Sequence, residues 1–167
     1  NNLDVTVAYT ANGTKSADNG ASATRTQTVS FVDENGNKLA DSDVQQLNFT
    51  KGADILDAYT GDVITAGQWS PAQAYKQVNA KVINGYVLKA GQPLTLGGAK
   101  TEHNDSDANL QFVYVKVGRI VPVENDGKIP IPGGEQPTYV NDPNDPRKVE
   151  PNEAIPAVDG YTVAGSN

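Results

Sequence analysis

The chain has one histidine, His103, and therefore one residue that could act as an ordinary general base near neutral pH. Asp105 and Ser106 stand close to it, so the residue types of a serine-hydrolase triad are all present. They are neighbours in one polar stretch, however, and the chain has no Gly-x-Ser-x-Gly motif that would hold a nucleophilic serine on a rigid turn. The sequence therefore predicts a protein that is not an enzyme.

Side chains that could bind calcium are also present, because carboxylate and amide oxygens are the ligands that this ion prefers. The alternating set of such residues is Asp33, Asn35, Asn37, Asp41 and Asp43. A calcium loop that begins at Asp33 would need Gly at its sixth position and Glu at its twelfth, but the chain has Lys38 and Val44 there. Two further oxygen-rich clusters, 103–107 and 141–145, are typical of solvated turns. We expect no metal site and no cofactor.

Charge and composition exclude several classes of partner. Of the 167 residues, 20 are acidic and 13 are basic, which gives a net charge of −7, and the basic residues are scattered singly. A nucleic-acid partner would need clustered Lys and Arg, so we expect none. No apolar run reaches the roughly 18 residues of a membrane-spanning helix, which argues against membrane insertion. The absence of methionine, at position 1 included, indicates an excised piece of a longer protein.

Most of the chain up to residue 117 has the pattern of β-structure. Apolar residues alternate over 24–33 and return over 47–49 after an Asn-Gly turn signal, which predicts a hairpin. A second hairpin is predicted over 54–68, around a Thr-Gly pair. The strongest strand pattern is 110–117, and because both of its faces are apolar we expect it to be a central strand.

The one helix signal lies at 70–73. Ser70 could cap a helix, Pro71 suits the first helical position, and Gln73 could complete a capping box. We therefore predict a short helix of at most two turns in this stretch.

Internal similarity indicates a modular repeat protein. Three pairs of segments resemble each other: 82–88 and 157–163, 32–38 and 123–128, and 2–9 and 109–114. The chain is therefore expected to hold the end of one module, a whole module and the start of another.

Composition also changes near residue 118, because eight of the ten prolines follow it. That proline-rich, acidic stretch favours extended backbone. We predict three parts: 1–23 as the terminal strand of a preceding module with its linker, 24–117 as a whole repeat domain, and 118–167 as a Pro-rich acidic connector with the start of the next module.

Six short motifs cover much of the central part: Thr24-Arg-Thr, Phe31-Val-Asp-Glu-Asn-Gly, Thr60-Gly-Asp-Val, Gln68-Trp-Ser-Pro-Ala, Val82-Ile-Asn-Gly-Tyr and Phe112-Val-Tyr-Val. In this order they resemble a mucus-binding (Mub-type, MucBP) repeat. That family occurs in cell-surface adhesins of lactobacilli and related Gram-positive bacteria. The resemblance covers roughly 24–117, and the segment from Arg119 onward is similar to the connectors and following modules of such proteins.

The resemblance implies a β-rich α+β fold. The expected form is an elongated β-grasp module, akin to ubiquitin and to the immunoglobulin-binding domains of protein L, with little helix and a Pro-rich extended segment after it. It also implies a secreted adhesin on the bacterial cell wall, whose anchor lies outside this sequence. The expected partners are host mucin glycans, bound noncovalently by monomers in a tandem array whose weak contacts add up by avidity.

Two alternatives to mucin binding stay open at this point. Some members of the family bind immunoglobulins, and an exposed strand edge could recognise one by adding a strand to the sheet. The module could also be a structural spacer of the adhesin stalk.

Four aromatic residues are the candidates for sugar binding: Tyr59, Trp69, Tyr75 and Tyr86. Aromatic faces stack on the C–H surfaces of sugars, and a phenol adds a hydrogen bond. The alternative is that these rings pack the small core. Burial tendencies favour the core for Trp69 and Tyr86, whereas Tyr59 and Tyr75 are as readily exposed.

Overall fold

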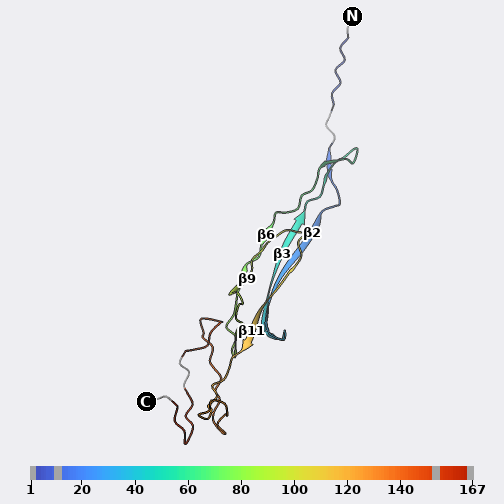
Figure 1. Ribbon diagram of the computed structural model, residues 1–167. Coiled ribbons are helices and arrows are strands. Elements are labelled where there is room, and N and C mark those ends of the chain that lie inside the picture. The colour runs from blue at the N-terminus through green and yellow to red at the C-terminus, as the bar shows by residue number, and fades with distance from the viewer. Residues whose placement is uncertain (1–2, 10–12, 152–154, 165–167) are drawn as a thin grey trace. The chain divides into compact units, whose positions relative to one another are not determined.

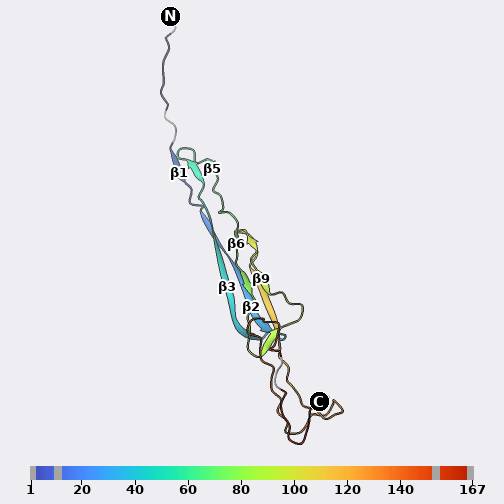
Figure 2. The same ribbon diagram turned by 90° about the vertical axis from the view of Figure 1, so that its left-hand side faces the viewer.

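The computed structural model describes residues 3–9, 13–151 and 155–164. These residues form eleven strands and no helix (Figures 1 and 2), so none of them builds a helix that could cross a membrane. The chain divides into two compact units. Unit 1 consists of Asn1–Thr26, Gln46–Tyr75 and Ala99–Asp107, and unit 2 consists of Gln27–Gln45, Lys76–Gly98 and Ala108–Asn167.

The first hairpin contributes to both units. Strands β2 (Ala21–Asp33) and β3 (Lys38–Lys51) are joined by a tight turn, as the Asn-Gly pair predicted. Gly36 has a φ of 81°, a left-handed conformation that glycine adopts without strain. The Asp33 N–H donates to the Asn37 carbonyl at 3.0 Å and closes the turn.

Unit 2 contains a four-stranded sheet in the order β3-β2-β11-β8. Strand β11 (Ala108–Lys116) runs parallel to β2 and antiparallel to β8 (Tyr86–Leu88). The predicted central strand is confirmed, because β11 has a neighbour on each side. A hairpin whose first strand pairs in parallel with the last strand of the sheet is the arrangement of a β-grasp module.

The core of unit 2 lies on one face of this sheet. Val29 and Phe31 of β2 and Phe112 and Tyr114 of β11 are each 0% exposed. Alternate residues of a strand point to the same face, which explains why these positions are buried together. Phe31 is paired with Phe112 in the parallel register, and their rings stack with centroids 5.5 Å apart.

A short two-stranded ribbon packs on this core. Strand β7 (Gln77–Asn79) pairs antiparallel with β9 (Thr95–Gly97), which places Val78 opposite Leu96. Val78 belongs to the buried cluster and Leu96 packs against it. In chain order the ribbon stands between the first hairpin and β11, where the β-grasp archetype has its helix.

Besides the start of β2 and the end of β3, unit 1 is built from short strands. Its two sheets have the orders β1-β4-β5 and β10-β6. The strands are β1 (Thr14–Ser16), β4 (Ile55–Asp57), β5 (Val63–Thr65), β6 (Gln73–Ala74) and β10 (Lys100–Thr101). The second hairpin, predicted over 54–68, is therefore confirmed as β4 and β5.

The helix predicted over 70–73 is wrong. The Ser70 hydroxyl accepts a hydrogen bond from the Thr50 N–H at 3.1 Å, and the Ser70 N–H donates to the Thr50 carbonyl at 2.8 Å. The Gln73 side chain donates to the Asn48 carbonyl at 2.7 Å. Both groups of the expected capping box are thus bonded to β3, so an extended segment satisfies them and a helix is not needed.

Candidate functional site

Tyr59 lies in the turn between β4 and β5 and is 87% exposed. The Asp57 carboxylate accepts hydrogen bonds from the backbone N–H groups of Tyr59, at 2.8 Å, and Thr60, at 2.9 Å. Gly61 follows with a φ of 78°. These features order the backbone of the turn, so the exposed ring has a defined support. A phenol held in this way can stack on a sugar and exchange a hydrogen bond with it.

Trp69 is the second aromatic feature of unit 1. Its ring stacks on the His103 imidazole, with centroids 4.1 Å apart and planes 7° from parallel. Both residues are half-buried, and Trp69 forms an isolated β-bridge with Lys51 of β3. The stack therefore leaves part of its aromatic surface accessible on a fixed support. Sequence reasoning treated His103 only as a possible base and missed this pairing, because the two residues are far apart in the chain.

Tyr75 is only 5% exposed, so its ring cannot stack on a ligand in this structure. The expectation that Tyr75 is as readily exposed as Tyr59 is wrong. Burial, followed by the Asp107 carboxylate, raises the pKa of the Tyr75 hydroxyl. That hydroxyl and the Arg25 Nε are buried without a hydrogen-bond partner among the described residues. Tyr75 is thus a packed residue of unit 1.

Tyr86 belongs to unit 2, where it is half-buried and packs against the core cluster. The structure therefore places three of the four aromatic candidates in unit 1 and one in unit 2. Of the four, Tyr59 is exposed, Trp69 and Tyr86 are half-buried, and Tyr75 is buried.

Asn141 holds the turn before β8, a contact that the sequence did not reveal. Its Oδ1 accepts from the Gly85 N–H at 2.8 Å, and its Nδ2 donates to the carbonyls of Ile83, at 3.1 Å, and Tyr86, at 2.6 Å. One side chain thus satisfies three backbone groups around Tyr86.

The domain boundary expected at residue 118 stays a prediction.

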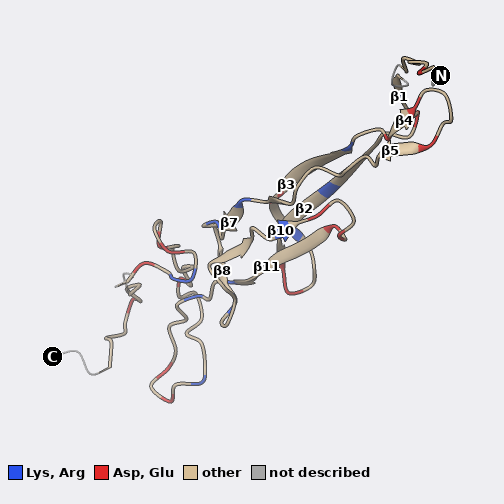
Figure 3. Ribbon diagram, turned by 90° about the horizontal axis from the view of Figure 1, so that it is seen from above, with Lys and Arg blue, Asp and Glu red and all other residues tan. Residues whose placement is uncertain are grey.

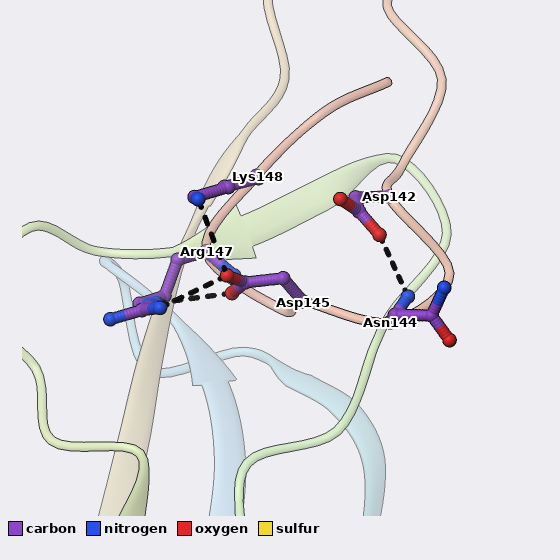
Figure 4. Close-up of polar contacts among 5 residues, drawn as sticks. All are labelled: Asp142, Asn144, Asp145, Arg147 and Lys148. Atoms are coloured by element: carbon purple, nitrogen blue, oxygen red, sulfur yellow. Dashed lines mark hydrogen bonds and ion pairs between the residues drawn. The ribbon is translucent and has the colours of Figure 1, made fainter. Parts of the chain in front are cut away.

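The loop after Asn141 is acidic, but its carboxylates accept hydrogen bonds from groups of the same loop (Figure 4). Asp145 accepts hydrogen bonds from the backbone N–H of Arg147, at 2.9 Å, and from its guanidinium, at 3.0 Å to each carboxylate oxygen. The side-chain bond to Arg147 contributes most to lowering the pKa of Asp145 to about 2. Asp142 accepts from the Asn144 N–H at 2.8 Å.

The oxygen-rich turn after β2 is satisfied in the same way. The Asp33 carboxylate accepts from the Asn37 side chain at 3.0 Å and from the backbone N–H groups of Asn35 and Asn37 at 2.9 Å. These bonds, that of the Asn37 side chain first, lower the pKa of Asp33. Within residues 3–9, 13–151 and 155–164, no group of three or more His, Asp or Glu side chains is arranged to hold a metal ion.

Two glutamines anchor the ribbon of unit 2, and sequence reasoning missed both. Gln27 is 0% exposed; its Oε1 accepts from the Gly98 N–H at 2.9 Å and its Nε2 donates to the Lys76 carbonyl at 3.2 Å. The Gln45 Oε1 accepts from the Lys76 N–H at 2.8 Å. Gly97 has a φ of 82°, and a Cβ there would collide with the Gln27 side chain. A polar residue in an alternating strand is normally expected to face solvent. The sequence therefore gave no indication that these two glutamines bond to the ribbon.

Basic residues are dispersed along the described chain, as Figure 3 shows by its short, separate blue stretches. The Lys89 Nζ lies 3.1 Å from the Glu34 carboxylate. The Lys81 Nζ lies 4.6 Å from the centre of the Phe31 ring, a cation–π contact. Two of the lysines that could have formed a patch for anionic sugars, Lys81 and Lys89, therefore have partners within their own unit.

Comparison with known proteins gives one family and several structural relatives. The model of the Muc B2-like domain family matches residues 16–118. No curated protein matches the chain. The crystal structure of Mub-RV matches with a TM-score of 0.52 and 19% identity, over 62% of this chain and 60% of that one. The chain therefore spans less than two thirds of the length of Mub-RV.

Two further structures extend this comparison. The mucin-binding domain of Spr1345 from Streptococcus pneumoniae matches with a TM-score of 0.50 and 20% identity, over 63% of this chain and 97% of that one. The type 2 repeat of the mucus binding protein MUB from Lactobacillus reuteri is 27% identical, with a TM-score of 0.43, over 57% of this chain and 50% of that one. The family resemblance and the β-rich fold inferred from the sequence are confirmed by these findings.

Proposed function

Because the chain belongs to the Muc B2-like domain family, we propose that it is a noncatalytic repeat of a bacterial surface adhesin that binds mucin glycoproteins outside the cell. The family match over residues 16–118 is the observation that carries the proposal. The relative from Streptococcus pneumoniae is described as a mucin-binding domain, which supports it.

The contact surface belongs to unit 1, on Tyr59 and on the stack of Trp69 with His103. Tyr59 is 87% exposed, and the stack is half-exposed, so both offer ring surface to the C–H face of a sugar. One ring contributes only about 0.5–1.5 kcal/mol to such a contact, which makes a single module a weak binder. Tandem modules then gain strength, because tethering turns later contacts into local events.

The charge of the protein shapes the expected response to salt. Mucins carry sialic acid and sulfate, and this chain has a net charge of −7, so long-range attraction does not drive the contact. Binding should change little, or strengthen slightly, as salt screens the repulsion. A steep loss with salt would instead point to Lys76, Lys81 and Lys89 and would overturn the aromatic model.

The deciding experiment measures binding of the full chain to immobilised mucin by surface plasmon resonance. Tyr59→Ala should weaken binding roughly 2- to 10-fold, the equivalent of one lost ring contact, without moving the melting temperature. Ile64→Ala is the matched control, because Ile64 is a 55% exposed, non-aromatic residue of the same hairpin. Tyr59→Phe separates stacking, which it keeps, from the phenol hydrogen bond, which it removes.

Trp69→Ala tests the second part of the surface. It removes one ring of a half-buried stack, so it should weaken mucin binding and also lower stability moderately. If Tyr59→Ala and Trp69→Ala both bind mucin as the unmodified chain does, the aromatic surface is not the site.

The same measurement separates the two alternatives. Binding of immunoglobulin but not of mucin would favour recognition through a strand edge, for which β3 is available as an outer strand of its sheet. Binding of neither by single or tandem copies would favour a spacer.

A further inference from the structure

Four asparagines of the chain are followed directly by glycine, at positions 12, 19, 35 and 84. Asparagine is a thermolabile residue, and glycine after it favours the reaction, because glycine has no side chain to hinder attack of its backbone nitrogen on the neighbouring amide carbon. The reaction replaces the amide with a carboxylate and so adds a negative charge. Asn12 lies outside the described residues, and the other three pairs can be compared.

Two of these pairs are restrained by bonds to aspartates. The Asn19 amide is held at both ends by Asp54: its Nδ2 donates to the carboxylate at 2.6 Å, and its Oδ1 accepts from the backbone N–H at 2.9 Å. In the turn after β2, the Gly36 N–H donates to the Asp33 carbonyl at 3.0 Å. The first pair is therefore restrained at the side chain that reacts, and the second at the nitrogen that attacks.

The third pair, Asn84 with Gly85, depends on one distant side chain. Asn84 is exposed, and its amide has no hydrogen-bond partner among the described residues. The Gly85 N–H donates to the Asn141 Oδ1 at 2.8 Å, across 56 residues of chain. Asn141 Nδ2 also donates to the carbonyls of Ile83 and Tyr86, on either side of the pair. Reaction requires the Gly85 nitrogen to lose its proton and rotate toward the Asn84 side chain, and the bond to Asn141 opposes both.

Asn141 belongs to a loop, residues 141–149, that is closed on itself. A β-bridge joins Asn141 to Val149, and the Asp142 N–H donates to the Lys148 carbonyl at 3.0 Å. Besides the Asn141 side chain, a second bond holds the loop on β8, because the Leu88 N–H donates to the Pro146 carbonyl at 2.8 Å. A segment with few anchoring bonds opens at a lower free energy than the sheet it covers.

We propose that Asn84 is a deamidation site that the loop 141–149 keeps closed, so that detachment of this loop from β8 opens the site to modification. In the first step the Gly85 nitrogen gives up its proton and bonds to the side-chain carbonyl carbon of Asn84. The bond from that carbon to Nδ2 breaks, and ammonia leaves. Water then opens the cyclic imide at either of its two carbonyls, which yields aspartate or isoaspartate. Water is the only co-reactant, and it reaches Asn84 because this residue is exposed.

The modification has a structural consequence. Isoaspartate carries the main chain through its side-chain carbon, so it lengthens the backbone by one carbon within the turn before β8. The Gly85 N–H and the Tyr86 carbonyl then no longer fit the two ends of the Asn141 amide. Detachment of the loop, if it lasts, thus becomes irreversible. The inference concerns unit 2 and stands whether or not unit 1 binds mucin.

Peptide mapping by mass spectrometry measures the reaction. The full chain is incubated in mildly alkaline buffer, with a parallel sample in concentrated urea, where Asn19, Asn35 and Asn84 should react at similar rates. In buffer Asn84 should react at least about 5-fold more slowly, because breaking one bond of ordinary strength lowers the open population by that factor. Asn141→Ala should accelerate Asn84 in buffer by at least about 5-fold and leave Asn19 and Asn35 slow.

Two variants control for other causes. Tyr114→Phe weakens the core of the same unit and leaves Asn141 in place, so it should not accelerate Asn84. Asn144→Ala changes an exposed residue of the same loop that bonds through its backbone N–H, and it should react like the unmodified chain. An unchanged rate at Asn84 in Asn141→Ala, equal acceleration of all three asparagines, or equal acceleration by Tyr114→Phe would each overturn the proposal.

Amide hydrogen exchange of the unmodified chain gives a measurement that needs no variant. Exchange at Gly85 and deamidation at Asn84 both require the Gly85 N–H to leave Asn141. The slowing of the two processes in buffer, each relative to the chain in urea, should therefore agree within about 3-fold, as expected for one shared opening. A Gly85 amide that exchanges as in urea, or an Asn84 that deamidates as fast in buffer as in urea, contradicts the proposal.

Discussion

Each unit of the protein buries a tyrosine, and the two hydroxyls have opposite surroundings. In unit 2 the Tyr114 hydroxyl donates to the Lys81 carbonyl at 2.8 Å and accepts from the Lys81 N–H at 3.0 Å. In unit 1 the Tyr75 hydroxyl is buried without a hydrogen-bond partner among the described residues. Burial raises the pKa of both hydroxyls, but only that of Tyr114 is opposed by a bond to Lys81.

The two units also differ in the exposure of their other aromatic residues. Phe31 and Phe112 of unit 2 are fully buried and stacked, so their contribution is to stability. In unit 1, Tyr59 is exposed and Trp69 is half-exposed, so their rings are available to a ligand. The buried rings of unit 2 therefore support its fold, whereas the accessible rings of unit 1 are the ones that we propose to contact a ligand.

The largest effect is expected from truncating the stacked core of unit 2. Phe112→Ala should lower the free energy of unfolding by about 3–5 kcal/mol, because it removes a fully buried ring and leaves a cavity. Denaturant unfolding followed by circular dichroism measures it. Ile64→Ala in unit 1, at a 55% exposed position, should change stability by less than about 0.5 kcal/mol. Similar losses for the two variants would erase the distinction between the units.

A smaller effect is expected at the clamp on Tyr86. Asn141→Ala removes three hydrogen bonds, each with a net contribution of roughly 1 kcal/mol, so unfolding should become easier by about 2–3 kcal/mol. The Gly85 amide should also exchange its hydrogen faster. Asn144→Ala is the control in the same loop, since Asn144 is exposed and bonds through its backbone N–H. Unchanged exchange at Gly85 would refute the clamp.

Removing the hydroxyl of each buried tyrosine, Tyr114 or Tyr75, should change stability by different amounts. Tyr114→Phe should cost about 1–2 kcal/mol, because it leaves the Lys81 N–H and carbonyl without their partner. Tyr75→Phe removes a hydroxyl that makes no such bond, so its effect should lie within about 0.5 kcal/mol of zero. Thermal melts of the two variants measured side by side give the difference. An equal cost for both would show that the Tyr75 hydroxyl is bonded in solution.

The smallest effect is expected at Asp145. Its pKa in the folded protein is about 2, below the ordinary 3.8, so its bonds to Arg147 stabilise the loop above about pH 4. That contribution is lost as the pH falls from about 4 to about 2, through the folded-state pKa. Melting curves of the unmodified chain and of Asp145→Asn should therefore differ at pH 5 and converge near pH 2, as expected for a single lowered pKa. Curves that stay parallel over this range would exclude the assigned pKa.

Much of the fold follows from the sequence, because its signals are local and repeat along the backbone. Alternation at Val29 and Phe31 predicted β2, the Asn-Gly pair predicted its turn, and the doubly apolar pattern at 110–117 predicted a central strand. A strand has a period of two and a tight turn needs particular residues, so neighbours in the chain are sufficient to reveal both. The six family motifs are also short runs of neighbouring residues, so the sequence alone reveals them.

Only the tertiary structure decided which polar and aromatic side chains meet. Ser70 and Gln73 had a helix signal, but bonds to β3 satisfied them in an extended chain. Tyr59 and Tyr75 have similar polar neighbours in the sequence, yet one is 87% exposed and the other 5%. Such outcomes depend on partners many residues away, and the free energy of a buried polar group depends on whether that partner arrives. The local sequence pattern therefore specified the strands of this protein. Packing between distant segments decided which polar and aromatic side chains are exposed.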